Sequence, residues 1–149
     1  MKLEYDSKYF MNKAIEEAQI ALSKGEVPIG AVIVIDNQII ARAHNLTETL
    51  NDVTAHAEIL AITTAENYLG GKFLNDCSMY VTLEPCQMCA GALYWSRISN
   101  LFYAANDLKR GFTIMGSTLH PKTKVNSGVL ENESKELLER FFISRRNLN

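Results

Sequence analysis

The chain has 149 residues, of which 47% are hydrophobic, and its formal net charge is −2. This size and apolar content suit one globular core, so we assign residues 1–149 to a single domain. A net negative charge does not favour nucleic-acid binding, which usually needs a basic surface. Three cysteines do not suggest a disulfide scaffold. The first residues show no secretory signal and no apolar stretch is long enough to cross a membrane, so we expect a cytoplasmic protein with no membrane contact.

The first predicted element is a helix. Asp6 or Ser7 has a side chain suited to cap its N-terminus, and Gly25 is placed to stop it. Between them, apolar side chains recur at helical spacing and form one stripe, namely Met11, Ile15, Ala18 and Leu22.

A β-hairpin is predicted next. Residues 29–35 form an apolar run rich in β-branched side chains, which favours a buried strand. Asp36 and Asn37 then turn the chain into a second strand over residues 38–43.

The second predicted helix carries the first group of residues that could take part in catalysis or metal binding. Thr54 can cap this helix, which places His56 and Glu58 in its first turn, and Gly70-Gly71 ends it. Residues 78–83 then form a buried strand.

The third helix carries the second group. We expect Pro85 in its first turn, with Cys86 and Cys89 three residues apart on one face, and an end near Trp95. A strand follows at 98–104 and an irregular stretch at 111–128. A final helix covers 133–146, with an apolar face of Leu137, Leu138, Phe141 and Phe142.

This order of elements predicts an α/β fold, a three-layer domain with helices on both faces of a central mixed sheet. Both polar groups fall at helix N-termini, where the helix dipoles help to keep cysteines as thiolates and favour a hydroxide.

His56, Cys86 and Cys89 supply one imidazole and two sulfur ligands, which Zn²⁺ favours, and a catalytic zinc keeps its fourth position for water. Bound zinc brings water close to ionising at neutral pH. Glu58, two residues from the histidine, can carry protons between that water and a leaving group. The pattern H-x-E…P-C-x-x-C is the signature of zinc-dependent nucleobase deaminases, so the sequence predicts a hydrolytic deaminase.

Each of these residues also has a plainer interpretation. Cys86 and Cys89 match a thioredoxin-like redox pair, although that chemistry needs no His56. Considered by itself, His56 could be an ordinary core or surface histidine, and Glu58 could be a solvated helix residue.

For most of the other cysteine, histidine and aromatic residues we expect structural roles. Cys77 is expected to be a small buried side chain near the start of a strand. His44 and His120 are expected in loops, and Tyr94 and Trp95 in the core or a subunit contact. Asn45 is either a turn residue or an amide that holds a ribose or a base edge.

Several longer strings resemble bacterial tRNA-specific adenosine deaminases, members of the cytidine-deaminase-like superfamily. The similarity spans nearly the whole chain. It is carried by residues 26–32 (EVPIGAV) with Asn45, by residues 54–58 (TAHAE), by residues 81–92 (VTLEPCQMCAGA), and by the tail at 141–146 (FFISRR).

The resemblance implies deamination of the wobble adenosine in a tRNA anticodon stem-loop to inosine, by a homodimer with one Zn²⁺ per subunit and no organic cofactor. It implies zinc ligands at His56, Cys86 and Cys89 and a proton shuttle at Glu58. It also implies contacts to the substrate, from the Ala57 backbone amide to the base, from Asn45 to the nucleotide, from Val27, Pro28, Ile29 and Leu83 around the base, and from Asp107 to the anticodon loop.

Directly after Asp107 the chain departs from the family. Residues 108–112 read LKRGF where the family commonly has Lys-Thr-Gly-Ala, so the resemblance does not say how this loop meets the RNA or a partner subunit. Cationic side chains form either a local phosphate-binding strip or ordinary surface charges, at Lys109, Arg110, Lys122, Lys124, Arg140, Arg145 and Arg146.

Two other functions compete with this interpretation. Residues 51–52, 76–77 and 102–105 are similar to guanine deaminases, so a free-base deaminase of the same fold is the main alternative. A non-catalytic zinc or redox module that binds a partner is the other, and it leaves Glu58 without a purpose.

Overall fold

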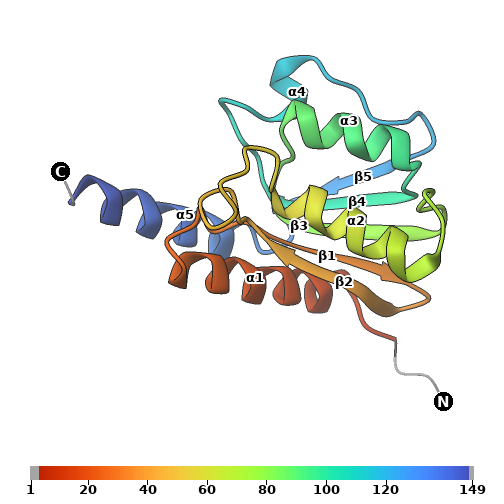
Figure 1. The fold of residues 1–149 in the computed structure, drawn as a ribbon, viewed down its shortest axis with the longest axis horizontal. Coiled ribbons are helices and arrows are strands. Elements are labelled where there is room, and N and C mark those ends of the chain that lie inside the picture. The colour runs from red at the N-terminus through yellow and green to blue at the C-terminus, as the bar shows by residue number, and fades with distance from the viewer. Residues whose placement is uncertain (1–3, 148–149) are drawn as a thin grey trace.

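The structure is a computed structural model that describes residues 4–147. Its centre is a five-stranded sheet in the order β2-β1-β3-β4-β5 (Figure 1). The helices and strands are α1 (Ser7–Ser23), β1 (Gly30–Ile35), β2 (Gln38–His44), α2 (Ala57–Leu69), β3 (Cys77–Leu83), α3 (Gln87–Ser96), β4 (Asn100–Ala105), α4 (Phe112–Met115), β5 (Lys124–Ser127) and α5 (Glu131–Arg146).

The sheet is mixed. β1 runs antiparallel to both β2 and β3, whereas β4 is parallel to β3 and β5 is parallel to β4. Helices α2 and α3 cover one face, and α1 and α5 cover the other (Figure 1). The predicted three-layer α/β domain around a mixed sheet is therefore confirmed.

Both faces of β1 are buried because each has a helical layer over it. Ala31 and Ile33 belong to the core beneath α2 and α3, whereas Val32 and Val34 pack in the core beneath α1. Alternate residues of a strand point to opposite faces, so a strand between two layers is apolar throughout. That is why residues 29–35 show no polar alternation.

The first three elements form as their sequence signals predict. Asp6 caps α1, and its carboxylate accepts the N–H of Tyr9 at 2.9 Å. Gly25, just beyond the end of α1, has a φ of +77°. In the hairpin, Asp36 and Asn37 both have positive φ, 49° and 62°, as the preferred two-residue turn requires.

The irregular stretch expected at 111–128 was wrong in part, because it holds α4 and the edge strand β5. All four side chains of β5 are exposed, so the strand has no apolar pattern and forms through backbone pairing with β4 alone. The final helix begins at Glu131, and Phe142 on its predicted apolar face is 52% exposed.

One edge of the sheet gathers the predicted functional residues. β1 begins beside the carboxyl end of β3, where Ala31 pairs with Val81, and α2 and α3 both start at this edge (Figure 1). Over residues 4–147, no helix is both long enough and apolar enough to cross a membrane.

Candidate active site

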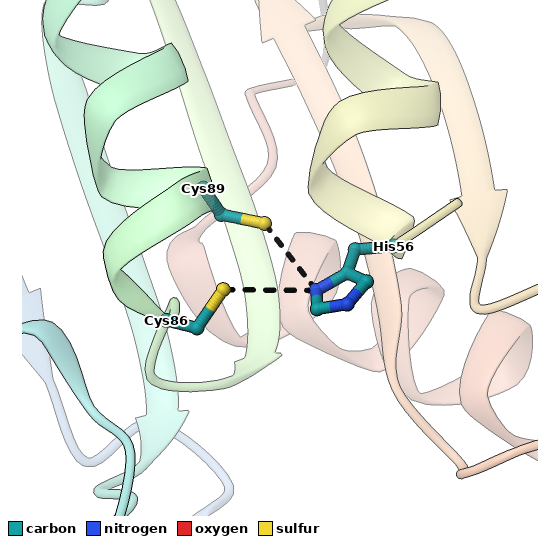
Figure 2. A group of neighbouring side chains, drawn as sticks. All are labelled: His56, Cys86 and Cys89. Atoms are coloured by element: carbon teal, nitrogen blue, oxygen red, sulfur yellow. Dashed lines mark hydrogen bonds between the residues drawn. The ribbon is translucent and has the colours of Figure 1, made fainter. Parts of the chain in front are cut away.

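His56, Cys86 and Cys89 come together in one cluster (Figure 2). The Nδ1 atom of His56 lies 3.7 Å from Sγ of Cys86 and 3.6 Å from Sγ of Cys89. The potential ligand atoms all lie within 4.8 Å of one another, which suits ligands that share one metal ion. The structure thus joins the imidazole predicted on one helix with the two sulfurs predicted on the next.

The cluster is built from two helix starts. His56 is the N-cap of α2 and Cys86 is the N-cap of α3, and neither side chain caps its own helix. Their backbone carbonyls accept the first helical hydrogen bonds, from the N–H of Leu60 at 3.0 Å and of Ala90 at 2.8 Å. Their side chains are therefore free to face each other, close to the positive ends of two helix dipoles.

Two predicted details of these helices were wrong. Thr54 does not cap α2, because its N–H and hydroxyl both donate to the carboxylate of Asp52, at 2.8 and 2.7 Å. Pro85 is not in the first turn of α3, because the helix starts only at Gln87 and the carbonyl of Pro85 accepts the N–H of Phe112.

The two sulfurs differ sharply in acidity. A hydrogen bond from the Cys89 thiol lowers the pKa of Cys86 to about 4, against the effect of burial and with further help from His56. The same Cys86 sulfur, together with burial and the nearby Glu58, raises the pKa of Cys89. Hydrogen bonding to Cys86 also raises the pKa of His56.

The sulfurs of Cys86 and Cys89 lie beside the buried carboxyl of Glu58, so ionisation of all three groups would need a positive charge to balance it. A dication supplies it, and a coordinating thiol is deprotonated outright. One imidazole with two sulfurs is also a donor set that Zn²⁺ favours. The residues present therefore fit a zinc ion.

Glu58 lies against this cluster. It is the second residue of α2, its side chain is 4% exposed, and it interacts with Cys89 through a side-chain hydrogen bond. Burial raises the pKa of Glu58 to about 7, although the charge of His56 opposes the rise. A carboxyl group with a pKa near neutrality can both take up and release protons at neutral pH.

A cavity of about 280 Å³ opens onto the cluster. His56 and Cys86 line it, and Arg110 lines it from the loop after β4. The other lining residues are Val53, Gln87, Met88 and Met115. A space of this size beside the candidate metal ligands can admit a small planar group.

The predicted substrate-binding residues lie around the same edge of the sheet, but none of them lines this cavity. The N–H of Asn45 donates to the carbonyl of Ile29 at 3.1 Å, and the N–H of Leu46 donates to the carbonyl of Ala55 at 3.0 Å. These bonds hold the segments that contain the predicted residues next to the start of α2.

The exposure of these residues varies. Pro28, Asn45 and Ala57 are buried, whereas Val27, Ile29, Leu83 and Asp107 are partly exposed. Their contacts with a nucleotide stay predictions.

Two buried glutamates that the sequence analysis missed organise the loops beside the site. Glu26 accepts the N–H of Glu48 at 3.1 Å and both the N–H and the hydroxyl of Thr49, at 2.6 and 2.7 Å. Glu84 does the same on the other side, where it accepts the N–H and the hydroxyl of Thr113 at 3.0 and 2.7 Å. Glu84 immediately precedes Pro85-Cys86, but nothing in a sequence marks a glutamate as buried.

The structural roles predicted for other residues had mixed outcomes. Cys77 is fully buried as the first residue of β3, as predicted. His44 is not in a loop: it ends β2, and its ring nitrogens contact Glu17 Oε1 and Lys24 Nζ, each at 2.9 Å. Trp95 is not in the core, because it is 76% exposed.

The chain is similar in sequence to known proteins along most of its length. A model of the family of MafB19-like deaminases matches residues 5–148. The tRNA-specific adenosine deaminase of Agrobacterium fabrum is 47% identical over 144 residues, which cover 93% of this chain and 95% of that protein.

Solved structures give two further similarities. One comes from a study of A-to-I editing by tRNA:A34 deaminases at the wobble position of transfer RNA. It matches with a TM-score of 0.81 and 46% identity, over 87% of this chain and 99% of the other. Guanine deaminase from Bacillus subtilis matches with a TM-score of 0.66 and 44% identity, over 68% of this chain and 66% of the other.

Proposed function

This chain belongs to the MafB19-like deaminase family. We propose that it is a zinc-dependent enzyme that deaminates the wobble adenosine of a tRNA anticodon loop to inosine by hydrolysis. The observation that carries the proposal is the juxtaposition of His56, Cys86 and Cys89 with the buried Glu58. Its substrate follows from the 47% identity with a tRNA-specific adenosine deaminase along 93% of the chain.

His56, Cys86 and Cys89 would hold the metal, one ion in each subunit. When bound, Zn²⁺ supplies a water molecule that loses its proton easily near neutral pH. Three protein ligands are the number typical of a catalytic zinc site, so the donor set suits hydrolysis better than a purely structural role.

Glu58 moves the protons. Its carboxylate takes a proton from the attacking water and delivers it to N1 of adenine, while the water oxygen forms a bond to C6. It then carries the second proton to the exocyclic amine, so that the C6–N6 bond breaks, ammonia leaves and inosine remains. The buried position of Glu58 beside the cluster keeps this relay short.

The surrounding backbone would orient the base. We assign the Ala57 N–H to a ring atom of adenine and the Asn45 amide to the nucleotide, with Val27, Pro28, Ile29 and Leu83 around them. Asp107 would contact the anticodon loop. An adenosine in such a loop is already partly unstacked, so its extraction costs less free energy than removal from a duplex.

We also propose that the enzyme works as a homodimer. Large apolar side chains are exposed near the site, with Val53 82% exposed and Leu108 78% exposed, and Trp95 is exposed on α3. A second copy would cover such side chains. Sedimentation equilibrium of the zinc-loaded protein tests this, and a monomer at micromolar concentration contradicts it.

The decisive experiment compares substrates. Zinc-loaded protein is incubated with anticodon stem-loop RNA, with adenosine, with guanine and with cytosine, and both inosine and ammonia are measured. Inosine at the wobble position of the stem-loop is the expected result. Ammonia from guanine with no change in the RNA would overturn the substrate while leaving hydrolytic deamination intact.

A guanine deaminase is the second candidate. It is supported by the 44% identity with the Bacillus subtilis enzyme, although that similarity covers 68% of this chain, less than the tRNA-specific relative covers. The substrate comparison separates the two, because only one of them requires a polynucleotide.

A further inference from the structure

We propose that Arg110 binds a backbone phosphate beside the target nucleotide and so favours polynucleotides over free bases. The inference rests on the proposed function and adds a residue that selects the substrate. It starts from the position of Arg110, in the loop between β4 and α4.

The location of Arg110 is the first support. Its side chain lines the same cavity as the candidate zinc ligands His56 and Cys86. The neighbouring wall is apolar, formed by Val53, Met88 and Met115. An arginine can lay its methylene stem along such a wall and keep its guanidinium in water, where it can bind an anion.

The second support is that the charge of Arg110 is available. The ion pairs of residues 4–147 are Lys13–Glu16, His44–Glu17 and Lys135–Glu131, and none of them involves Arg110. Its side chain is exposed, and within the same described range it has no hydrogen-bond partner. Its donors are therefore free to bind an external anion.

The third support is that the backbone beneath Arg110 is fixed. The carboxylate Oδ1 of Asp107 accepts the N–H groups of Lys109 and Arg110, both at 3.0 Å. The next residue, Gly111, forms a β-bridge with Cys86. The backbone of the loop is thus tied directly to a candidate zinc ligand, which keeps Arg110 beside the cavity.

The chemistry of arginine selects the ligand. Its planar fork matches the paired oxygens of a phosphate, with charge-assisted hydrogen bonds. A strand that sends one base into the cavity carries a phosphate on either side of that base, whereas a free base carries none. The Asp107 carboxylate does not hold the guanidinium, because none of the ion pairs within residues 4–147 joins Asp107 to Arg110.

The test measures RNA binding as a function of salt, with zinc-loaded wild type, Arg110→Gln and Arg110→Lys. The probe is anticodon stem-loop RNA at salt concentrations between about 50 and 200 mM, and the readouts are Kd and the slope of log Kd against log salt. Arg42→Gln is the matched control, because Arg42 is also exposed and lies in the edge strand β2, outside the cavity at the zinc ligands.

Loss of one phosphate contact should weaken binding of Arg110→Gln about tenfold at the lowest salt and reduce the slope by about 0.7 to 0.9. Arg110→Lys should regain most of the slope, and kcat at saturating RNA should stay within about twofold, since the contact is not to the reacting atoms. Arg42→Gln should match wild type.

An unchanged slope in Arg110→Gln, or an equal loss in Arg42→Gln, overturns the inference but leaves the proposed function standing. If wild type neither binds nor deaminates the stem-loop, the proposed function fails and Arg110 loses its assignment with it.

Discussion

Gly111 lies so close to the carboxylate of Glu84 that a β-carbon on Gly111 would stand 2.3 Å from Glu84 Cδ. This contact joins the segment after β3 to the loop after β4. Glu84 also accepts the N–H groups of Asp107 and Thr113, each at 3.0 Å. The loop that presents Asp107 and Arg110 is therefore held against the segment that carries the candidate ligand Cys86.

Gly111→Ala should destabilise the protein. Its methyl group would meet the Glu84 carboxyl group, and overpacking of this kind costs about 1 to 3 kcal/mol. Chemical denaturation at neutral pH measures the change in the free energy of unfolding. Gly91→Ala is the control, because a β-carbon there meets nothing within 4 Å and the residue lies within α3, where alanine is favoured over glycine by roughly 0.5 to 1 kcal/mol. Equal stability of Gly111→Ala and wild type would mean that the loop yields without cost.

Glu84→Gln should make stability less dependent on pH in acid. Burial opposes ionisation of Glu84, but hydrogen bonds from Thr113, Asp107 and Asn106 outweigh it and hold the pKa below the ordinary value of 4.5. A lowered pKa means that the folded protein favours the carboxylate. The stabilisation is therefore complete above about pH 4.5 and is lost as the pH falls through the folded-state pKa.

Urea denaturation between neutral pH and acid tests this prediction. At neutral pH the variant should be less stable by about 1 to 3 kcal/mol, because its amide cannot satisfy several donors at once. The gap between variant and wild type should narrow below pH 4.5. A gap that stays constant down to acid pH would show that Glu84 is not a carboxylate that the fold stabilises.

The fold was predictable wherever apolar spacing and turn residues agree. The stripe of α1 and the buried strand β3 follow from local apolar patterns. The turn follows from Asp36 and Asn37, residue types that tolerate positive φ. β5 was missed because its pairing with β4 is made by backbone groups far apart in the sequence, and its side chains remain in solvent.

The site divides in the same way. The cluster of His56, Cys86 and Cys89 was predictable because metal coordination restricts residue type and spacing strongly. The helix starts were not, since Thr54 turned out to be bound by Asp52 and the N-cap position fell to His56 itself. Glu26 and Glu84 could not be found either, because the donors that make their burial tolerable come from segments 22 to 29 residues away.

Cys86→Ala should abolish stoichiometric zinc binding. It removes one of the three candidate ligands, and the remaining imidazole and sulfur cannot complete the site. Metal content after dialysis against a weak chelator measures the loss, and the midpoint of thermal unfolding should no longer rise with added zinc. Cys77→Ala, which changes a buried cysteine outside the cluster, should still hold one zinc per chain. Loss of zinc from Cys77→Ala alone would place the metal elsewhere.

Glu58→Gln should keep zinc but lose turnover. The amide is nearly the same size as the carboxyl group, so the cluster should persist. The amide, however, cannot accept a proton from water. General acid–base catalysis typically contributes about 10²- to 10⁴-fold, and a single group that serves both proton transfers should cost at least that much in kcat. Inosine formation on stem-loop RNA and metal content are measured on the same sample. Glu66→Gln, further along α2, is the matched control and should react as wild type does. A Glu58→Gln enzyme that holds its zinc and still turns over at the normal rate would mean that another group moves the protons.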